Sequence, residues 1–145
     1  MFLGKYPSAL DDQSRLPVPG AFKDELSGSH FITQGFDRNL LILTAGAFQE
    51  VYRRVTSLNI ADPLARLLLR MILGTAHEFE MDASGRVVIP DDLRAFAGLD
   101  LNALLVGQGD YLEIWSPELW DAQAAQINDA EANGARFAML TISTR

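Results

Sequence analysis

A nine-residue segment that occurs twice, 71 residues apart, constrains the fold of this chain more than any other feature. The first copy, residues 11–19, reads DDQSRLPVP, and the second, residues 82–90, reads DASGRVVIP. In each copy an Asp stands four residues before an Arg, three mostly apolar residues follow, and a Pro closes the run. The pattern predicts a turn that presents a fixed cation and then a short strand. Its duplication predicts two related structural units.

The predicted elements follow the same order in both halves of the chain. In the first half we expect a strand at 4–10, a short helix at 21–26, a hairpin of strands 30–34 and 40–43, a helix from about Ala47 capped by Thr44, and a helix at 63–73. In the second half we expect strands at 78–81 and 87–89, a short helix from Pro90 ended by Gly98, a hairpin of strands 103–106 and 111–115, and a helix opened by Ser116 and Pro117. The tail from Asn133 to Arg145 shows no period and is expected to be irregular.

Each unit is too small to bury a good core alone. We therefore expect the two units, residues 1–75 and residues 76–145 with a C-terminal helix and irregular tail, to share strands and pack as one pseudo-twofold body. The predicted class is α+β and rich in β-strands.

Charge and composition narrow the function classes. The net charge of −7 argues against a nucleic-acid partner, but residues 1–75 carry a net charge of +1 and residues 76–145 carry −8. The chain has no cysteine, and no apolar run approaches the length that spans a bilayer. We expect a cytoplasmic protein without a thiolate metal site.

The two motif arginines, Arg15 and Arg86, have two interpretations. Each guanidinium can contact O6 and N7 of a guanine, or it can pair with its own Asp11 or Asp82 to hold the turn. Each arginine can also do both in turn, with the Asp aligning the guanidinium in the free protein. Weaker candidates for phosphate contacts are Lys5, Lys23 and Arg94. Arg38 is a fourth basic residue of this kind, but ordinary surface charge explains it better.

Other chemistry-bearing residues have structural explanations. His30 and His77 each begin an apolar strand and are expected to be hydrogen-bonded structural histidines. Helix capping and turns explain the acidic pairs at 11–12 and 91–92, and the Gly-Gln-Gly at 107–109 lacks the third glycine of a dinucleotide site. We therefore expect no enzyme activity, metal, cofactor or small-molecule substrate.

With these motifs in order, the chain resembles the MraZ family of bacterial transcriptional regulators to about residue 125. The segments that carry the resemblance are Met1-Phe2-Leu3-Gly4, residues 11–19, Gly35-Phe36-Asp37, residues 82–90 and Leu105-Val106-Gly107. The resemblance implies two tandem AbrB-like swapped-hairpin repeats that form an intramolecular pseudo-dimer. It also implies ring-shaped homo-oligomers that bind direct repeats in the promoter of the division and cell-wall gene cluster, including the regulator's own gene.

Two positions depart from the family pattern. Leu3 stands where the family commonly has a basic residue, which removes a possible phosphate contact. The first loop has Ser14 where the family usually has the glycine that is matched by Gly85, so a positive φ there would strain the serine. We expect Asp11, Asp82, Ser14 and Gly85 to orient the two loops.

The resulting hypothesis is a sequence-specific regulator that binds double-stranded DNA, associated with the nucleoid in the cytoplasm. The alternative is an acidic protein-binding scaffold or antitoxin-like module, whose acidic second half docks a basic partner. The sequence leaves open the subunit number, the sign of the effect on transcription and the DNA repeat.

Overall fold

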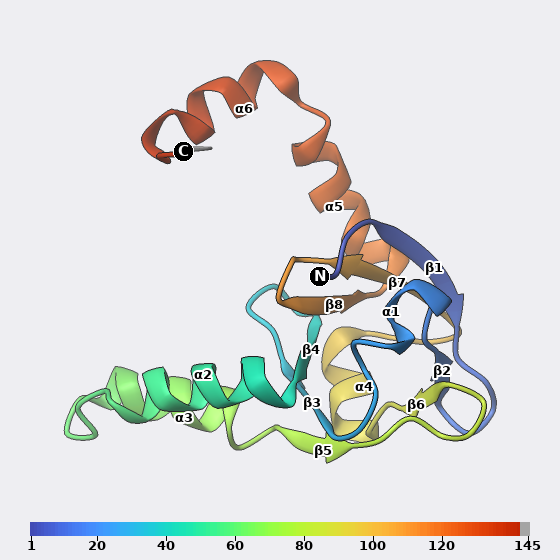
Figure 1. The fold of residues 1–145 in the computed structure, drawn as a ribbon. Helices are drawn as coiled ribbons and strands as arrows, with labels where there is room; N and C mark the ends of the chain where they lie inside the picture. The colour runs from blue at the N-terminus through green and yellow to red at the C-terminus, as the bar shows by residue number, and fades with distance from the viewer. Residues whose placement is uncertain (143–145) are drawn as a thin grey trace.

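The computed structural model describes residues 1–142 and contains two antiparallel β-sheets with helices around them (Figure 1). The first unit contains β1 (Lys5–Ala9), β2 (Arg15–Pro17), α1 (Gly20–Lys23), β3 (His30–Gln34), β4 (Leu40–Thr44), α2 (Ala45–Thr56) and α3 (Pro63–Ile72). The second contains β5 (His77–Phe79), β6 (Arg86–Val88), α4 (Asp91–Ala97), β7 (Asn102–Gly107), β8 (Tyr111–Trp115), α5 (Pro117–Ile127), α6 (Ala130–Arg136) and the 3-10 turn η1 (Phe137–Met139). The predicted β-rich α+β class is confirmed.

The two units exchange strands. The large sheet has the order β1-β7-β8-β4-β3-β5, so β1 of the first unit pairs with β7 of the second, and β5 of the second pairs with β3 of the first. The two hairpins meet at the centre through the β4–β8 pair. Strands β2 and β6, one from each unit, form a separate two-stranded ribbon. Neither unit completes its sheets alone, which confirms the expected sharing of strands.

The hydrophobic core connects the ribbon to the sheet. Leu16 and Val87, which face each other across the ribbon, are both buried, and so are Phe22 of α1 and Leu93 of α4. From the sheet they meet Ile32, Leu40, Ile42, Leu105, Leu112 and Ile114. Each such side chain stabilises the fold by roughly 1.5–3 kcal/mol when fully buried. The inner face of the ribbon is thereby anchored, and its outer face is left to solvent.

Local signals set most helix ends. The hydroxyl of Thr44 accepts a hydrogen bond from the Ala47 backbone N–H at 3.2 Å, so the predicted cap is confirmed, although α2 begins at Ala45. Ser116 Oγ accepts from the Leu119 N–H at 3.1 Å ahead of Pro117, as predicted. Gly98 ends α4 with a φ of 65°.

Three predicted elements need correction. The short helix expected at 21–26 covers only Gly20–Lys23, and the strand expected at 78–81 is His77–Phe79 because it stops where its pairing with β3 stops. The tail expected to be irregular from Asn133 instead contains most of α6 and all of η1. Asp129 caps α6 by accepting from the Ala132 N–H, and alanines favour the helix that follows. Residues 143–145 of that expectation lie outside the described residues.

His30 is buried at the start of β3. Its Nε2 contacts the carbonyl oxygen of Leu26, its ring lies against Phe79 with centroids 5.6 Å apart, and its Nδ1 has no hydrogen-bond partner. The expectation of a hydrogen-bonded structural histidine is thus confirmed for one ring nitrogen and wrong for the other. Burial lowers the pKa of His30, while the Leu26 carbonyl and the nearby Glu80 carboxylate oppose the shift.

This lowered pKa predicts a loss of stability on mild acidification. The unfolded chain takes up a proton near its normal pKa of about 6.5, whereas the folded chain does so only at lower pH, so the free energy of unfolding falls as the pH drops below about 6.5. Urea unfolding measured from pH 7.5 to 5.5 should show this decline in the wild type and in His77→Gln, and a much smaller decline in His30→Phe. An equal decline in all three proteins would exclude His30 as its origin.

Candidate nucleic-acid interface

The two motif loops have the same internal hydrogen bonds, and these explain the Asp-x-x-x-Arg spacing. One oxygen of Asp11 accepts from the backbone N–H groups of Gln13 and Arg15, both at 2.9 Å, and the other accepts from Arg15 Nε at 2.7 Å. The backbone closes the turn, because the Asp11 N–H donates to the Arg15 carbonyl at 3.0 Å. An acid four residues before the arginine therefore fixes both the turn and the guanidinium.

The second loop repeats this arrangement. Asp82 accepts from the N–H groups of Ser84 and Arg86 at 2.9 and 3.0 Å and from Arg86 Nε at 2.9 Å. The Asp82 N–H donates to the Arg86 carbonyl at 2.9 Å. The structural pairing considered for each arginine is thus present in both loops.

These bonds hold both carboxylates in the charged form. The Arg15 backbone N–H is the main cause of the lowered pKa of Asp11, and the Arg86 backbone N–H is the main cause of the lowered pKa of Asp82. Both carboxylates therefore stay charged at pH values somewhat below the usual pKa of an aspartate. Their stabilisation of the loops is lost as the pH falls through the lowered pKa values.

The strand exchange joins the two loops into one surface. In the ribbon Arg15 faces Val88 and Pro17 faces Arg86, and the ladder extends to the Val18 N–H with the Gly85 carbonyl and the Ile89 N–H with the Ser14 carbonyl. Arg86 Nη1 also lies 3.5 Å from Asp11 Oδ2, so it reaches the acid of the other loop. The side chains of Arg15 and Arg86 are 27% and 30% exposed, respectively. We call the outer face of this ribbon, formed by Arg15, Pro17, Arg86 and Val88, the ribbon face.

The sequence predicted only part of the ribbon face. The two arginines were identified by the motif, whereas Val88, which is largely exposed, and Pro17 were not. The alternation of exposure along β2 and β6 places both on the same side as the arginines. That period-2 alternation was the available signal.

The loop-orienting positions differ as the sequence indicated. Ser14 has a φ of 58° and Gly85 has a φ of 75°, so both loops need the left-handed region and the serine is the strained one. Ser14 Oγ accepts a hydrogen bond from Arg94 Nη1 at 2.5 Å, which offsets part of that strain. At the other loop the end of the Lys23 side chain lies where a side chain on Gly85 would be placed, with Cε 2.6 Å from the ideal Cβ position.

The three weaker basic candidates lie in different surroundings. Lys23 and Arg94 each reach the loop of the other unit, so both border the ribbon face. Arg94 is also bound to its own turn, because Nε and Nη2 donate to the carbonyls of Leu99 and Asp100 at 3.2 and 2.7 Å. Lys5 is placed elsewhere, with Nζ 5.9 Å from the ring centroid of Trp120 on α5.

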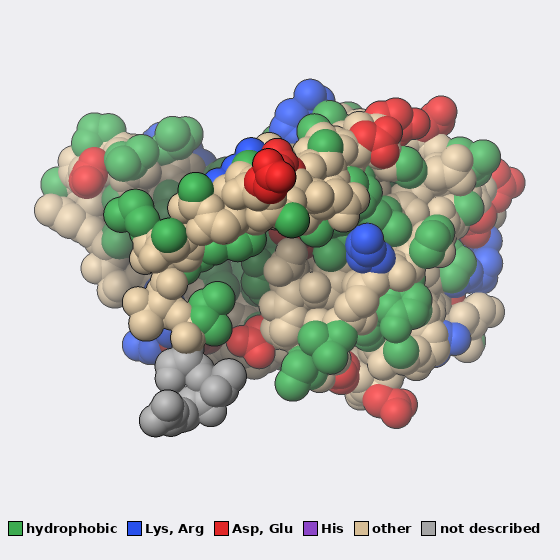
Figure 2. All heavy atoms as spheres, turned by 90° about the horizontal axis from the view of Figure 1, so that it is seen from above, with side chains coloured by type: hydrophobic (Ala, Val, Ile, Leu, Met, Phe, Trp, Pro, Cys, Tyr) green, Lys and Arg blue, Asp and Glu red, His purple; other side chains and the backbone are tan. Residues whose placement is uncertain are grey.

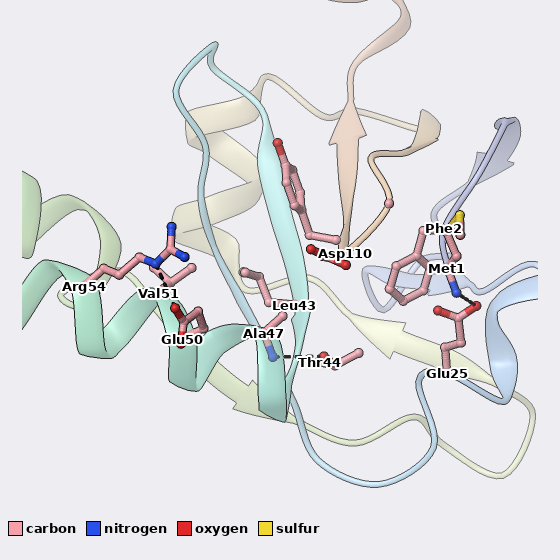
Figure 3. Close-up of a pocket in the computed structure, with 12 residues that line it drawn as sticks. Met1, Phe2, Glu25, Leu43, Thr44, Ala47, Glu50, Val51, Arg54 and Asp110 are labelled. Atoms are coloured by element: carbon pink, nitrogen blue, oxygen red, sulfur yellow. Dashed lines mark hydrogen bonds and ion pairs between the residues drawn. The ribbon is translucent and has the colours of Figure 1, made fainter. Parts of the chain in front are cut away.

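A hollow between the N-terminal segment, β4 and α2 offers no reactive arrangement (Figure 3). Glu25 pairs with the ammonium group of Met1, and Glu50 pairs with Arg54 at 2.8 Å. Its remaining lining is mostly apolar, with Phe2, Leu43 and Val51 among the residues. Within residues 1–142, no group of three or more His, Asp or Glu side chains is placed to hold a metal ion, and no helix is long and apolar enough to cross a membrane.

One protein family matches nearly the whole chain in the comparisons with known proteins. The family model described as "MraZ protein, putative antitoxin-like" matches twice, over residues 1–71 and 72–140. The transcriptional regulator MraZ of Thermomicrobium roseum is 44% identical over 124 residues, covering 86% of this chain and 87% of the relative. Proteins of the same name from Roseiflexus castenholzii and Corynebacterium kroppenstedtii are 40% and 34% identical, covering 95% and 92% of this chain and 94% of each relative.

The geometry of the two loops predicts unequal effects of substituting Ser14 and Gly85, the residues that precede the motif arginines. Ser14→Gly relieves strain of about 1–2 kcal/mol but adds about 0.5–1 kcal/mol of backbone entropy and loses a hydrogen bond of similar size, so we expect a change within about 1 kcal/mol. Gly85→Ala should destabilise by about 1–2 kcal/mol, because an L-residue enters the left-handed region and displaces Lys23. Urea unfolding of both variants at neutral pH measures the difference. A Gly85→Ala protein as stable as wild type would contradict this account of the loops.

Proposed function

This chain belongs to the MraZ family, and from that premise we propose that it is a transcriptional regulator that binds double-stranded DNA sequence-specifically through the ribbon face. The observation that carries the proposal is that Arg15 and Arg86 lie on the same face of one two-stranded ribbon. The major groove of B-DNA admits a two-stranded β-ribbon, and arginine is the residue that most often contacts guanine there. The curated relatives carry the name transcriptional regulator.

The hydrogen bonds of each loop favour base reading. In both loops the Asp takes Nε of the arginine and the terminal nitrogens form the outer end of the guanidinium, where Nη1 of Arg86 also lies 3.5 Å from Asp11 Oδ2. A guanidinium held in this way keeps its planar fork in a fixed orientation, and two of its N–H groups match O6 and N7 of guanine. The carboxylate thus serves both interpretations of the motif: it stabilises the turn and it orients the base-reading group.

The ribbon geometry gives the spacing of the contacts. Strand spacing places the Cα atoms of Arg15 and Arg86 about 8 Å apart on the diagonal of the ribbon, which corresponds to roughly two base-pair steps. Val88, exposed opposite Arg15, offers an apolar contact for a thymine methyl group. Lys23 at the edge of the ribbon face is the better placed phosphate ligand, since the donors of Arg94 are already bonded within the chain.

One chain supplies few cations and carries a net charge of −7, so affinity has to come from several chains acting together. We propose a ring-shaped homo-oligomer whose subunits contact direct repeats in the promoter of the division and cell-wall gene cluster that includes the regulator's own gene. The site of action is the nucleoid in the cytoplasm.

An antitoxin-like or scaffold role is the second candidate. The acidic charge of α5 and α6 favours it, because Glu118, Asp121, Asp129 and Glu131 are all exposed there. The description of the matching family model also contains the term antitoxin-like. A stoichiometric basic protein partner, together with no retardation of the upstream DNA, would favour this role over the first.

The DNA-binding proposal predicts a specific loss on truncating either arginine. Arg15→Ala and Arg86→Ala should each weaken binding to the DNA upstream of the chain's own gene by roughly ten- to a hundredfold, the value of a good arginine–guanine pair. Arg86→Lys should keep the binding to unrelated DNA and lose the preference for the upstream sequence, since lysine lacks the planar fork. Fluorescence anisotropy across a range of salt concentrations measures both quantities.

The matched control is Arg38→Asn, which removes one exposed arginine from the β3–β4 turn. Arg38 has a φ of 54°, and asparagine tolerates that region, so this variant loses a charge without local strain. Its specific affinity should stay within about twofold of wild type at physiological salt. Equal affinity of wild type and Arg86→Ala for the upstream DNA would sink the proposal of a specific contact.

A further inference from the structure

The face of the large sheet that is turned away from the ribbon carries a buried carboxylate among apolar side chains. Leu41 of β4 lies opposite Glu113 of β8, and Leu43 lies opposite Tyr111. These positions alternate with the core residues of the same strands, so they lie on the other face of the sheet. Glu113 is only 8% exposed. Burying a carboxylate is costly unless its charge is paired and its oxygens are hydrogen-bonded, so Glu113 needs an explanation.

Hydrogen bonds within the chain satisfy only one oxygen of this carboxylate. Trp115 Nε1 and Gln108 Nε2 both donate to Oε1 of Glu113 at 3.0 Å. Within residues 1–142, the second oxygen, Oε2, accepts no hydrogen bond, and the polar side-chain atoms that are sealed from solvent without a partner are His30 Nδ1 and Asn39 Nδ2. Oε2 therefore faces accessible space, and a buried carboxylate keeps one acceptor for a donor from outside the chain.

A cavity of about 360 Å³ lies next to this carboxylate, between the sheet and helices α2 and α3, and Glu113 is part of its lining. Figure 1 shows α2 and α3 extending from one side of the sheet, and Figure 2 shows a hollow bordered by hydrophobic side chains on the side of the molecule seen from above. A volume of this size and a mostly apolar lining with a few convergent polar groups are typical of small-molecule sites. The apolar walls are formed by Leu41 and Leu43 of β4, Val51 and Val55 of α2, and Leu68 and Ile72 of α3.

The polar part of the lining is acidic. Asp37, in the turn between β3 and β4, and Tyr111 line the cavity together with Glu113. Burial raises the pKa of Tyr111, and the negative charges of Glu113 and Asp37 raise it further, so both carboxylates act on the same hydroxyl. Arg54 also lines the cavity, but its Nε donates to Glu50 at 2.8 Å. The charge of the arginine is thereby offset, and two carboxylates remain for an occupant.

This lining discriminates between classes of occupant. An anion would be repelled by Asp37 and Glu113. A hard metal ion takes about six or more oxygen ligands, whereas these two carboxylates lie among apolar walls. An organic cation matches both parts of the lining, because its N–H groups can donate to the carboxylates and its carbon skeleton can contact the apolar walls.

We propose that this cavity is a binding site for a small organic cation, a protonated amine joined to an aromatic or branched aliphatic body. The ammonium group donates to Oε2 of Glu113 and lies near Asp37, and the apolar body contacts the side chains of α2 and α3. Phe36, which is 70% exposed and also lines the cavity, adds an aromatic ring for the cation. The site lies on the other face of the sheet from the ribbon, so this inference goes beyond the proposed function and does not depend on it.

Equilibrium dialysis of the full chain without DNA tests the site with benzylamine, phenethylamine and tryptamine, which are protonated at neutral pH. Each amine is compared with the carboxylate that has the same body, namely phenylacetate, phenylpropionate and indolepropionate. At least one amine should bind at one site per chain with a dissociation constant of about 1 mM or lower. Its matched carboxylate should bind at least about tenfold more weakly, because it meets Glu113 and Asp37 as a like charge.

Three variants locate the bound amine. Glu113→Gln keeps an acceptor for Trp115 and removes the charge, so it should weaken amine binding about tenfold or more, the value of a hydrogen bond to a charged group. Asp37→Asn removes an exposed charge and should weaken binding about two- to fivefold. Val55→Phe should weaken the binding of every amine, because the added ring takes up part of the cavity. Circular dichroism checks that each variant is folded.

The matched control is Asp110→Asn. Asp110 is an exposed acid next to Tyr111 that lines the hollow beside the N-terminal segment and not this cavity, so its amine affinity should stay within about twofold of wild type at physiological salt. No binding of any amine, equal binding of each amine and its carboxylate, or full amine affinity in folded Glu113→Gln or Val55→Phe would each overturn the proposal. Because no DNA is present, none of these results depends on the ribbon face.

Discussion

The hydrogen bonds of two aspartate carboxylates hold the loops on which the rest of the account depends. Asp11 and Asp82 each bond two backbone N–H groups and one arginine Nε, so a single side chain shapes the turn and fixes the cation. A hydrogen bond to an ionised group is roughly twice as strong as a neutral one. Strand exchange then places both loops on one ribbon, and the buried Leu16 and Val87 fasten that ribbon to the sheet.

Local chemistry in the sequence predicted much of this structure. Thr44 and Ser116 cap the helices assigned to them, and Ser14 adopts the positive φ that the second loop's glycine indicated. These predictions succeeded because each depends on one residue and its neighbours within a turn. The duplication also predicted that the two units share strands, since each is too short to bury a core alone.

Contacts between distant segments escaped prediction. The pairing of β2 with β6 joins residues 69 to 73 positions apart, so the exposed positions of Val88 and Pro17 on the ribbon face follow only from the fold. Arg94, predicted to contact phosphate, is held by carbonyls that the left-handed turn at Gly98 brings within reach. Helix α6 was missed because its signals, Asp129 at the cap and Asn133 bonded back to α5, are single polar residues without hydrophobic periodicity.

The central claim is that the motif arginines read guanine, and base-analogue substitution tests it most directly. Replacing single guanines of the upstream repeats by 7-deazaguanine removes the N7 acceptor and leaves the rest of the base pair intact. The account predicts that at certain positions this substitution weakens binding of wild type. At each such position it should have no further effect on the one variant, Arg15→Ala or Arg86→Ala, that lacks the arginine contacting that guanine. The same loss in wild type and in both variants, or no loss at any guanine, would contradict it.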